Sequence, residues 1–258
     1  MPTHPPKTPS GEPLTGRRAL VTGGSRGIGR GIALAFADAG ADVAIGYRRD
    51  RESADAVVAE IEARGRRASA HAADVRDGEA VHAMLKAAVE TLGGLDVAVA
   101  NAGVPARFEP LQQVDPGYWQ RVIDIDLTGV FNTLHAALPV LQAQQSGVLL
   151  TVSSVAADMC GANGGPYVAA KAAVNAMTRM VAKENAAIGV RANVIAPGLV
   201  ATELAEGMLE FHGDRLVKGI PLGRMGTVDE IGRMAVYLAS DDAEWITGKV
   251  FRIDGGQI

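Results

Sequence analysis

The sequence of 258 residues has little cysteine, few aromatic side chains and no long hydrophobic run. Its single cysteine, Cys160, excludes an internal disulfide and fits a reducing compartment, so we interpret it as a small packing residue. No apolar run approaches the ~20 residues that a membrane helix needs, and the N-terminus lacks the apolar segment of a signal peptide. These absences predict a soluble, cytoplasmic protein.

An excess of positive charge is also lacking, because 25 lysines and arginines face 29 aspartates and glutamates. The net charge of −4 gives no basic surface for nucleic acid or an anionic membrane. None of the five histidines stands at metal-ligand spacing from Cys160, so we expect no metal site. Residues 1–14 are rich in proline, which neither pairs in a sheet nor continues a helix. We expect a disordered tail there and one folded domain over 15–258.

Short apolar runs alternate along that domain with longer stretches of helical periodicity. Strands are expected at 18–22, 42–47, 67–72, 96–101, 147–153, 190–196 and 249–253, and helices at 27–39, 53–64, 77–92, 122–144, 167–187 and 228–239. Alternating strands and helices form a parallel sheet with helices on both faces. The predicted fold class is therefore α/β, as a single doubly wound domain of the Rossmann type.

Two helix starts and one unassigned segment complete this pattern. Ser53 and Asp77 are the N-cap residues that we expect for the second and third helices. The segment 204–222 has no partner in the alternation and follows the end of a strand, where open α/β sheets bind ligands. We interpret it as a mobile lid over a substrate.

A glycine-rich turn between the first strand and the first helix is the strongest single motif. It covers residues 22–29, TGGSRGIG, and its glycines have the spacing G-x3-G-x-G. Glycines let the backbone approach a pyrophosphate, and the helix N-terminus presents free N–H groups to that anion. The alternative is a turn that only packs the helix on the strand. The loop residues expected to contact a dinucleotide are Gly23, Ser25, Arg26, Gly27, Ile28 and Gly29.

The second predicted strand indicates which dinucleotide binds. It ends at Tyr47, Arg48 and Arg49, where NAD-preferring sites place an acidic residue that holds the ribose 2′-hydroxyl. Arg26 in the glycine-rich turn points to the same region. Guanidinium groups bind a phosphate bidentately, so the sequence predicts NADP(H) as the cofactor. Arg49 is equally well explained as part of a solvated basic turn.

Two further turns follow the third and fourth predicted strands. They are Asp74-Val75 and Asn101-Ala102-Gly103, and a dinucleotide would run above both strand ends. Asp74 is suited to accept a hydrogen bond from the adenine amino group, and the second turn is suited to line a ribose. Taken alone, either sequence is also explained by the residues that turns commonly contain.

Tyr167 and Lys171 are four residues apart at the start of a predicted helix and therefore share one face. A lysine cation beside a phenol favours the phenolate, which makes the tyrosine a usable general acid or base. A lone pair of this kind is usually a surface contact. Here Ser154 ends the fifth strand 13 residues earlier and can donate a hydrogen bond to the same substrate oxygen.

Together these motifs resemble those of the short-chain dehydrogenase/reductase family over about residues 15–258. They read TGGSRGIG, DV after the third strand, NAG, SS followed by YVAAK, and PGLVAT. The closing segment from residue 220 resembles that of the bacterial 3-oxoacyl-thioester (acyl carrier protein) reductases. The resemblance implies a seven-stranded parallel sheet and a homotetramer.

The resemblance also implies roles for individual residues. Tyr167 would give or take the proton, Lys171 would tune it and bind the nicotinamide ribose, and Ser154 would orient the carbonyl. The residues that would back the nicotinamide or hold its carboxamide are Pro197, Gly198, Val200 and Thr202.

Asp126 departs from the family pattern, because the family has an asparagine at this place in the DLTGVF segment. The family asparagine lies near the catalytic lysine, and its backbone carbonyl helps to hold a water linked to that lysine. If only the backbone matters, Asp126 is a neutral replacement. If its side chain faces the site, its carboxylate would pair with Lys171 and belong to the catalytic set.

The predicted function is an NADP(H)-dependent oxidoreductase that interconverts a ketone, with a 3-oxoacyl thioester as one candidate, and a secondary alcohol. The alternatives are an oxidising dehydrogenase of an alcohol, sugar or sterol, and a dinucleotide-binding regulator without catalysis. The complete set of Ser154, Tyr167 and Lys171 argues against the regulator. Substrate walls are expected from 104–108, Met159, Cys160, Asn163 and 204–222.

The expected partners are a small-molecule substrate and further copies of the chain. Residues 138–148 and 186–189 carry no charge, although carrier-dependent relatives have basic residues at the matching places. Steering of an acidic acyl carrier protein should therefore be weak. Arg107 or Lys183 would be the substitutes for such a basic surface.

Overall fold

The computed structural model describes residues 11–203, 205 and 215–258. Seven parallel strands form one sheet in the order β3-β2-β1-β4-β5-β6-β7. The strands are β1 (Arg18–Thr22), β2 (Asp42–Tyr47), β3 (Ala68–Ala72), β4 (Val97–Ala100), β5 (Gly147–Val152), β6 (Val190–Pro197) and β7 (Val250–Ile253). The order reverses between β1 and β4, which creates the crevice where such sheets bind ligands.

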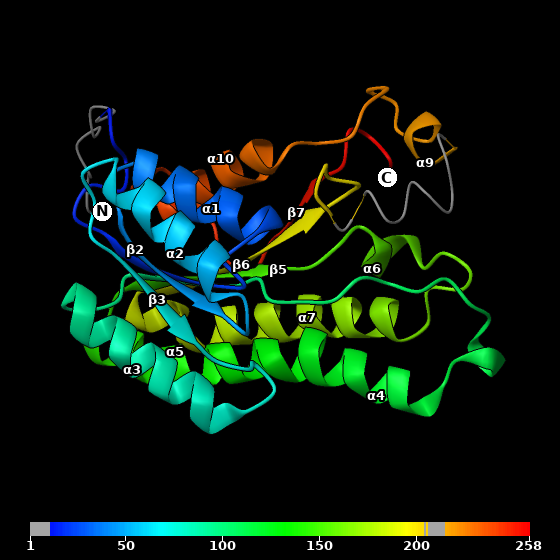
Figure 1. Ribbon diagram of the computed structural model, residues 1–258, viewed down its shortest axis with the longest axis horizontal. Coiled ribbons are helices and arrows are strands. Elements are labelled where there is room, and N and C mark those ends of the chain that lie inside the picture. The colour runs from blue at the N-terminus through cyan, green and yellow to red at the C-terminus, as the bar shows by residue number, and fades with distance from the viewer. Residues whose placement is uncertain (1–10, 204, 206–214) are drawn as a thin grey trace.

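Helices cover both faces of the sheet (Figure 1). They are α1 (Gly27–Asp38), α2 (Arg51–Glu62), α3 (Gly78–Leu92), α4 (Pro116–Ile123), α5 (Gly129–Gln144), α6 (Ala156–Met159), α7 (Gly165–Asn185), α9 (Arg215–Lys218) and α10 (Val228–Ala239). One layer contains α1, α2 and α10, and the other contains α3, α5 and α7. The predicted doubly wound α/β fold with seven parallel strands is confirmed.

Alternation along the strands builds two separate apolar cores. In β1, Ala19 and Val21 belong to the core under α1 and α10, whereas Leu20 belongs to the core under α3 and α5. Successive strand residues point to opposite faces, and helices bury both faces, so the central strands β1, β4 and β5 are mainly apolar. The polar residues of the site lie in the turns after the strands and on the helices that follow.

The helix expected over 122–144 is interrupted. A π-helical turn, Asp124–Thr128, separates α4 from α5. Such a turn adds one residue to the helical repeat and is frequent at functional sites. Helical periodicity does not show this insertion, since both flanking helices keep a buried face.

The N-cap expected at Ser53 is wrong, because Asp50 caps α2. Asp50 Oδ1 accepts a hydrogen bond from the Ser53 amide at 3.0 Å, so the helix begins two residues earlier than expected. Asp77 does cap α3, and its carboxylate accepts bonds from the amides of Glu79 and Ala80. Both caps satisfy backbone donors that a helix start otherwise leaves free.

The structure describes only part of the expected tail and part of the expected lid. Residues 1–10 of the tail, and 204 and 206–214 of the lid, lie outside them. Leu14 is fully buried, and its amide donates to the Ala39 carbonyl at 2.8 Å. The packed domain therefore begins before residue 15, where the sequence placed its boundary. No helix in the described ranges is long and apolar enough to cross a membrane.

Candidate active site

The residues predicted for the cofactor and for catalysis surround one cleft of about 960 Å³. The cleft lies at the carboxyl ends of the strands and runs from the turn after β1 to the start of α7. Each predicted residue lines it, from Gly23 to Thr202 and including Asp126. The structure thus brings the predicted site together, while the chemical role of each residue stays a prediction.

The turn after β1 depends on glycine at defined positions. Gly23 and Gly27 have positive φ angles of 65° and 53°, which glycine adopts without strain. A Cβ at Gly29 would lie 2.2 Å from the Gly23 carbonyl oxygen, so no larger residue fits there. Asn101 fastens the turn, because its Nδ2 donates to the Thr22 and Gly23 carbonyls at 2.9 and 3.3 Å.

This turn leaves the N-terminus of α1 open toward the cleft. Arg26 is the N-cap residue, and its side chain makes no cap hydrogen bond. The Arg26 side chain therefore leaves the first N–H groups of the helix uncovered. Free N–H groups at a helix N-terminus attract phosphate. The turn and the open helix start therefore fit the pyrophosphate of a dinucleotide.

The end of β2 presents positive charge to the same cleft. Arg48 and Arg49 are exposed and line the cleft, and among the residues that the structure describes neither is held in a salt bridge. Asp50 lies beside them, but its oxygens accept bonds from the Ser53 amide and hydroxyl at 3.0 and 2.7 Å. The hydrogen bond from the Ser53 amide lowers the pKa of Asp50. This carboxylate is therefore engaged in capping α2.

Asp74 and Arg76 form an ion pair beyond β3. The two Asp74 oxygens accept from Arg76 Nε at 2.9 Å and Nη2 at 2.6 Å, and these hydrogen bonds lower the pKa of Asp74 to about 2. Any hydrogen bond from an adenine would be an additional one.

Arg26 lies across the cleft edge from Glu203, with 3.7 Å between Nη1 and Oε2, and both side chains are mostly exposed. Exposed pairs of this kind contribute little, so Arg26 is free to turn to a ligand.

Asp126 and Lys171 form a buried ion pair at the inner end of the cleft. Lys171 Nζ lies 3.1 Å from Asp126 Oδ1 and donates to the Val152 carbonyl at 3.2 Å. Asp126 Oδ2 accepts from the Val104 amide at 3.1 Å. Of the two alternatives for Asp126, the structure supports the one in which the side chain faces the site. Burial is the largest single influence and lowers the pKa of Lys171, but the charge of Asp126, the charge of Tyr167 and the hydrogen bond to Asp126 together raise it above its ordinary value.

The π-helical turn and a glycine make room for this pair. Asp126 lies in the middle of the turn and is fully buried. A Cβ at Gly103 would lie 2.7 Å from Asp126 Oδ1 and 3.5 Å from Lys171 Nζ. The glycine of the NAG turn therefore has a packing reason that its place in a motif does not reveal.

Tyr167 and Ser154 complete the inner end of the cleft. Tyr167 is half-buried one turn before Lys171 on α7, with 5.5 Å between Nζ and the centre of the phenol ring. Ser154 follows β5, and its Oγ accepts from the Ala156 amide at 3.1 Å. Its hydroxyl hydrogen is thereby left for another acceptor. The set can therefore present two hydroxyl donors to one substrate oxygen, with a cation behind the phenol.

The substrate part of the cleft is mostly apolar. Its walls include residues that sequence reasoning named and others that it missed: Val104, Pro105, Ala106, Phe108, Met159, Val168, Leu199, Ala205 and Gln257. Gln257 follows β7 at the chain end, and nothing in the sequence connected it with the site. Its Oε1 is buried and has no hydrogen-bond partner among the residues that the structure describes.

Several residues expected in these walls do not line the cleft, namely Arg107, Cys160, Asn163 and residues 217–222 of the lid. Cys160 and Asn163 have positive φ angles of 47° and 69°, which redirects the chain after α6. Cys160 is exposed, so its interpretation as a packing residue is also wrong. Arg107 is exposed, and its guanidinium lies 4.5 Å from the centre of the Tyr118 ring.

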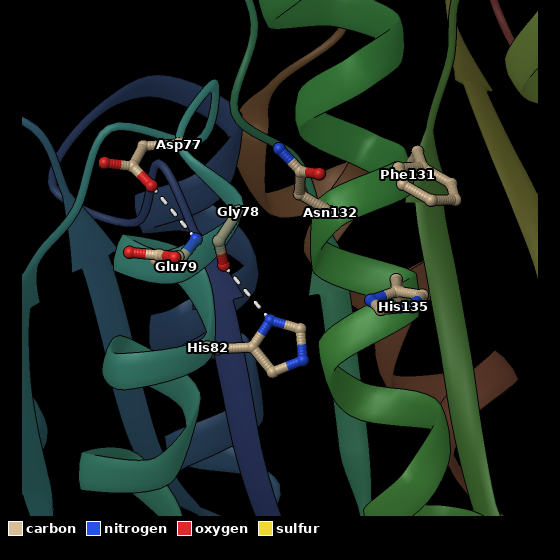
Figure 2. A pocket seen from close by; sticks show the side chains of 7 residues that line it. All are labelled: Asp77, Gly78, Glu79, His82, Phe131, Asn132 and His135. Atoms are coloured by element: carbon tan, nitrogen blue, oxygen red, sulfur yellow. Dashed lines mark hydrogen bonds between the residues drawn. The ribbon is translucent and has the colours of Figure 1, made fainter.

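A second hollow of about 540 Å³ lies outside the cleft, between the start of α3 and α5. Figure 2 shows His82 and His135 facing one another across it, and their ring centres are 5.4 Å apart. In the described ranges no group of three or more ligating side chains could hold a metal ion. Asn132 of this hollow donates to the Val75 carbonyl at 2.8 Å and so supports the floor of the main cleft.

Comparison with known proteins agrees with this geometry. A family described as Enoyl-(Acyl carrier protein) reductase matches residues 23–257. The chain is similar to the 3-oxoacyl-acyl-carrier-protein reductase FabG of Staphylococcus aureus, with 41% identity over 93% of this chain and 97% of that protein. It is also similar to the 3-oxoacyl-acyl-carrier-protein reductase of Synechocystis sp., with 40% identity over 95% of this chain and 98% of the relative.

A solved structure extends the likeness to three dimensions. A short-chain type dehydrogenase/reductase from Mycobacterium marinum superimposes with a TM-score of 0.90 and 36% identity, over 95% of this chain and 96% of the other. The seven-stranded parallel sheet is the one that the sequence motifs led us to expect, and the glycine-rich turn, Ser154, Tyr167 and Lys171 line one cleft. The chain belongs to the short-chain dehydrogenase/reductase family.

Proposed function

We propose that the protein is an NADP(H)-dependent oxidoreductase that interconverts a ketone and a secondary alcohol, with Tyr167 as general acid and base. The observation that carries the proposal is the continuity of one cleft. It connects a glycine-rich turn at the open start of α1 with Ser154, Tyr167 and Lys171. A dinucleotide in this cleft would bring its reactive end to the proton-transferring group.

The residues present fit NADP(H). The turn of Gly23 to Gly29 would hold the pyrophosphate, and Arg48 and Arg26 would hold the 2′-phosphate. Arg49 lines the same edge and is the third candidate. Pro197 and Gly198 would back the nicotinamide, with Val200 and Thr202 beside its carboxamide. When bound, the cofactor supplies or accepts the hydride.

The protein side of the reaction is proton transfer and orientation. The Ser154 hydroxyl donates to the substrate oxygen and fixes the carbonyl. The Tyr167 hydroxyl gives its proton to that oxygen in reduction and takes it back in oxidation. Lys171, held by Asp126 and the Val152 carbonyl, lies beside the phenol ring and binds the nicotinamide ribose.

We favour free, small and mainly apolar ketones as substrates. The cleft walls include apolar side chains such as Val104, Met159 and Leu199. Binding of apolar substrate groups against them is favourable because it removes apolar surface from water. The named relatives act on 3-oxoacyl groups on acyl carrier protein. Residues 138–148 and 186–189 offer that acidic partner no charge, so we expect carrier-bound substrates to hold no strong advantage.

The test is NADPH consumption with a panel of ketones that includes free and carrier-bound 3-oxoacyl thioesters. We expect turnover of several ketones. Tight NADPH binding without turnover of any of them would favour the non-catalytic regulator. Faster turnover of alcohols, sugars or sterols with NADP than of any ketone with NADPH would favour the oxidising dehydrogenase.

Self-association as a homotetramer is part of the proposal. Within the described part of the chain, β7 pairs with β6 alone, and an edge strand offers unpaired backbone groups to a second chain. Trp245 is 96% exposed. Covering this side chain with a further copy of the chain would remove a large apolar surface from water. Light scattering should show an assembly, and Trp245→Ser should reduce its mass.

A further inference from the structure

Asp126 places a negative charge where the family has a neutral side chain. The carboxylate is fully buried and lies 3.1 Å from Lys171 Nζ. It also accepts a hydrogen bond from the Val104 amide at 3.1 Å. Lys171 is itself only 4% exposed. Buried charges interact strongly because little water screens them.

We propose that Asp126 is a positioning residue that neutralises Lys171 and thereby keeps Tyr167 in its proton-donating form, so that the enzyme favours carbonyl reduction at neutral pH. This inference rests on the proposed function and adds the working direction to it. It concerns a residue in which this chain departs from its family.

The direction follows from the balance of the reaction. In reduction the carbonyl carbon receives a hydride from the reduced nicotinamide, and its oxygen receives the phenolic proton. The products are the alcohol, the oxidised cofactor and the phenolate, which is reprotonated from water. Oxidation runs in reverse and must start from the phenolate, which takes the alcohol proton.

A cation beside the phenol favours the phenolate, and an anion beside that cation opposes the effect. With an asparagine at position 126, Lys171 would act on Tyr167 with its full charge. With Asp126 the pair is close to neutral, so the phenol keeps its proton to higher pH. Reduction therefore proceeds at neutral pH, while oxidation requires alkaline conditions.

The groups around Asp126 leave this pair as the dominant electrostatic feature. Lys171 contacts it from α7, Tyr167 lies beside that lysine, and Tyr118 of α4 is close enough to feel its charge. Burial raises the pKa of Tyr118, and Asp126 adds to that shift, so Tyr118 carries no charge at neutral pH. Arg107 and Glu109 act on Tyr118 with opposite signs. In the part of the chain that the structure describes, Lys171 is the one cation paired with Asp126.

The test compares pH profiles of the wild type, Asp126→Asn and a control, with a ketone from the panel and its alcohol. Asparagine has the same shape as aspartate, and its side-chain oxygen can still accept a hydrogen bond from the Val104 amide. Asp124→Asn is the matched control, because Asp124 lies in the same π-helical turn but accepts from Gln120 Nε2 at 2.7 Å. It changes charge by the same amount away from Lys171.

For Asp126→Asn we expect two shifts of about 1–2 pH units toward neutrality. The ascending limb of oxidation and the descending limb of reduction should both move to lower pH. Near neutral pH, oxidation should rise roughly tenfold, since one unit on such a limb is a factor of ten. NADPH affinity should stay close to wild type. A merely structural role would lower both rates without moving the limbs.

The outcomes separate this inference from the proposed function. Wild-type turnover with superimposable profiles for Asp126→Asn would overturn the inference and leave the function standing. An equal shift in Asp124→Asn would also overturn it. A wild type without turnover in either direction would overturn both. If Asp126→Asn does not fold, the wild-type profile decides: a midpoint of the oxidation limb near neutrality contradicts the inference, and one well above neutrality supports it.

Discussion

Lys171 Nζ lies 3.1 Å from Asp126 Oδ1, with the lysine side chain 5% and the aspartate side chain 0% exposed. Each charge is therefore compensated chiefly by the other. Removing one partner of a buried pair leaves an uncompensated charge, whereas removing both leaves none.

The pair should consequently show strong coupling in stability. Lys171→Met leaves the Asp126 carboxylate buried and alone, and should lower the free energy of unfolding by about 3–5 kcal/mol. Adding Asp126→Asn to that variant should recover a substantial part of the loss. Urea unfolding of the four proteins measures the coupling. Additive losses would mean that the two charges do not interact in the folded protein.

Arg48 should determine the preference for NADPH over NADH. Its guanidinium is exposed at the cleft edge, and a charge-assisted hydrogen bond to phosphate contributes about 1.5–3 kcal/mol. Arg48→Ala should therefore raise the NADPH dissociation constant by roughly one to two orders of magnitude, with NADH affinity little changed.

Arg51→Ala is the control for this measurement, because Arg51 pairs with Asp55 on α2 rather than lining the cleft. It should alter neither affinity. If Arg48→Ala weakens NADPH and NADH equally, Arg48 does not read the 2′-phosphate. If wild-type NADH binds as tightly as NADPH, the cofactor assignment itself is wrong.

His71 should make the fold sensitive to mild acid. Burial lowers its pKa below the ordinary 6.5, and its Nε2 lies 2.9 Å from Ser69 Oγ. The folded state therefore resists protonation more than the unfolded state does. Its contribution to stability is present above the ordinary pKa and is lost as the pH falls through the lowered value.

His71→Gln removes this titration. The difference in free energy of unfolding between the wild type and His71→Gln should thus shrink between about pH 7.5 and pH 5. Urea unfolding at several pH values gives that difference directly. A constant difference over the range would show that His71 titrates alike in both states.

The fold and most of the site could be predicted because their signals are local. The glycine-rich turn lies between one strand and one helix, and Tyr167 and Lys171 are one helical turn apart, so spacing alone brings these residues to the cleft. Periodicity likewise identified all seven strands. Strand ends of a parallel sheet share one edge, which is why distant turns such as Asp74 and Asn101 could be assigned to one site.

The features that sequence reasoning missed depend on packing between distant segments. The helices on either side of the π-helical turn that holds Asp126 each keep a buried face. Hydrophobic periodicity therefore does not reveal the turn. Gln257 reaches the cleft from the chain end. Cys160 is exposed because its own left-handed backbone conformation redirects the chain, and Leu14 is buried although it follows a proline-rich stretch.

The most direct test of the proposed function is the turnover of Tyr167→Phe, compared with Tyr237→Phe. Both variants lose one phenolic hydroxyl, but Tyr237 lies exposed on α10, outside the cleft. General acid catalysis contributes about 10²–10⁴-fold, so NADPH-dependent ketone reduction by Tyr167→Phe should fall by that factor, with unchanged NADPH binding and with Tyr237→Phe as active as the wild type. Near-normal turnover by Tyr167→Phe would contradict the assignment of the proton to Tyr167.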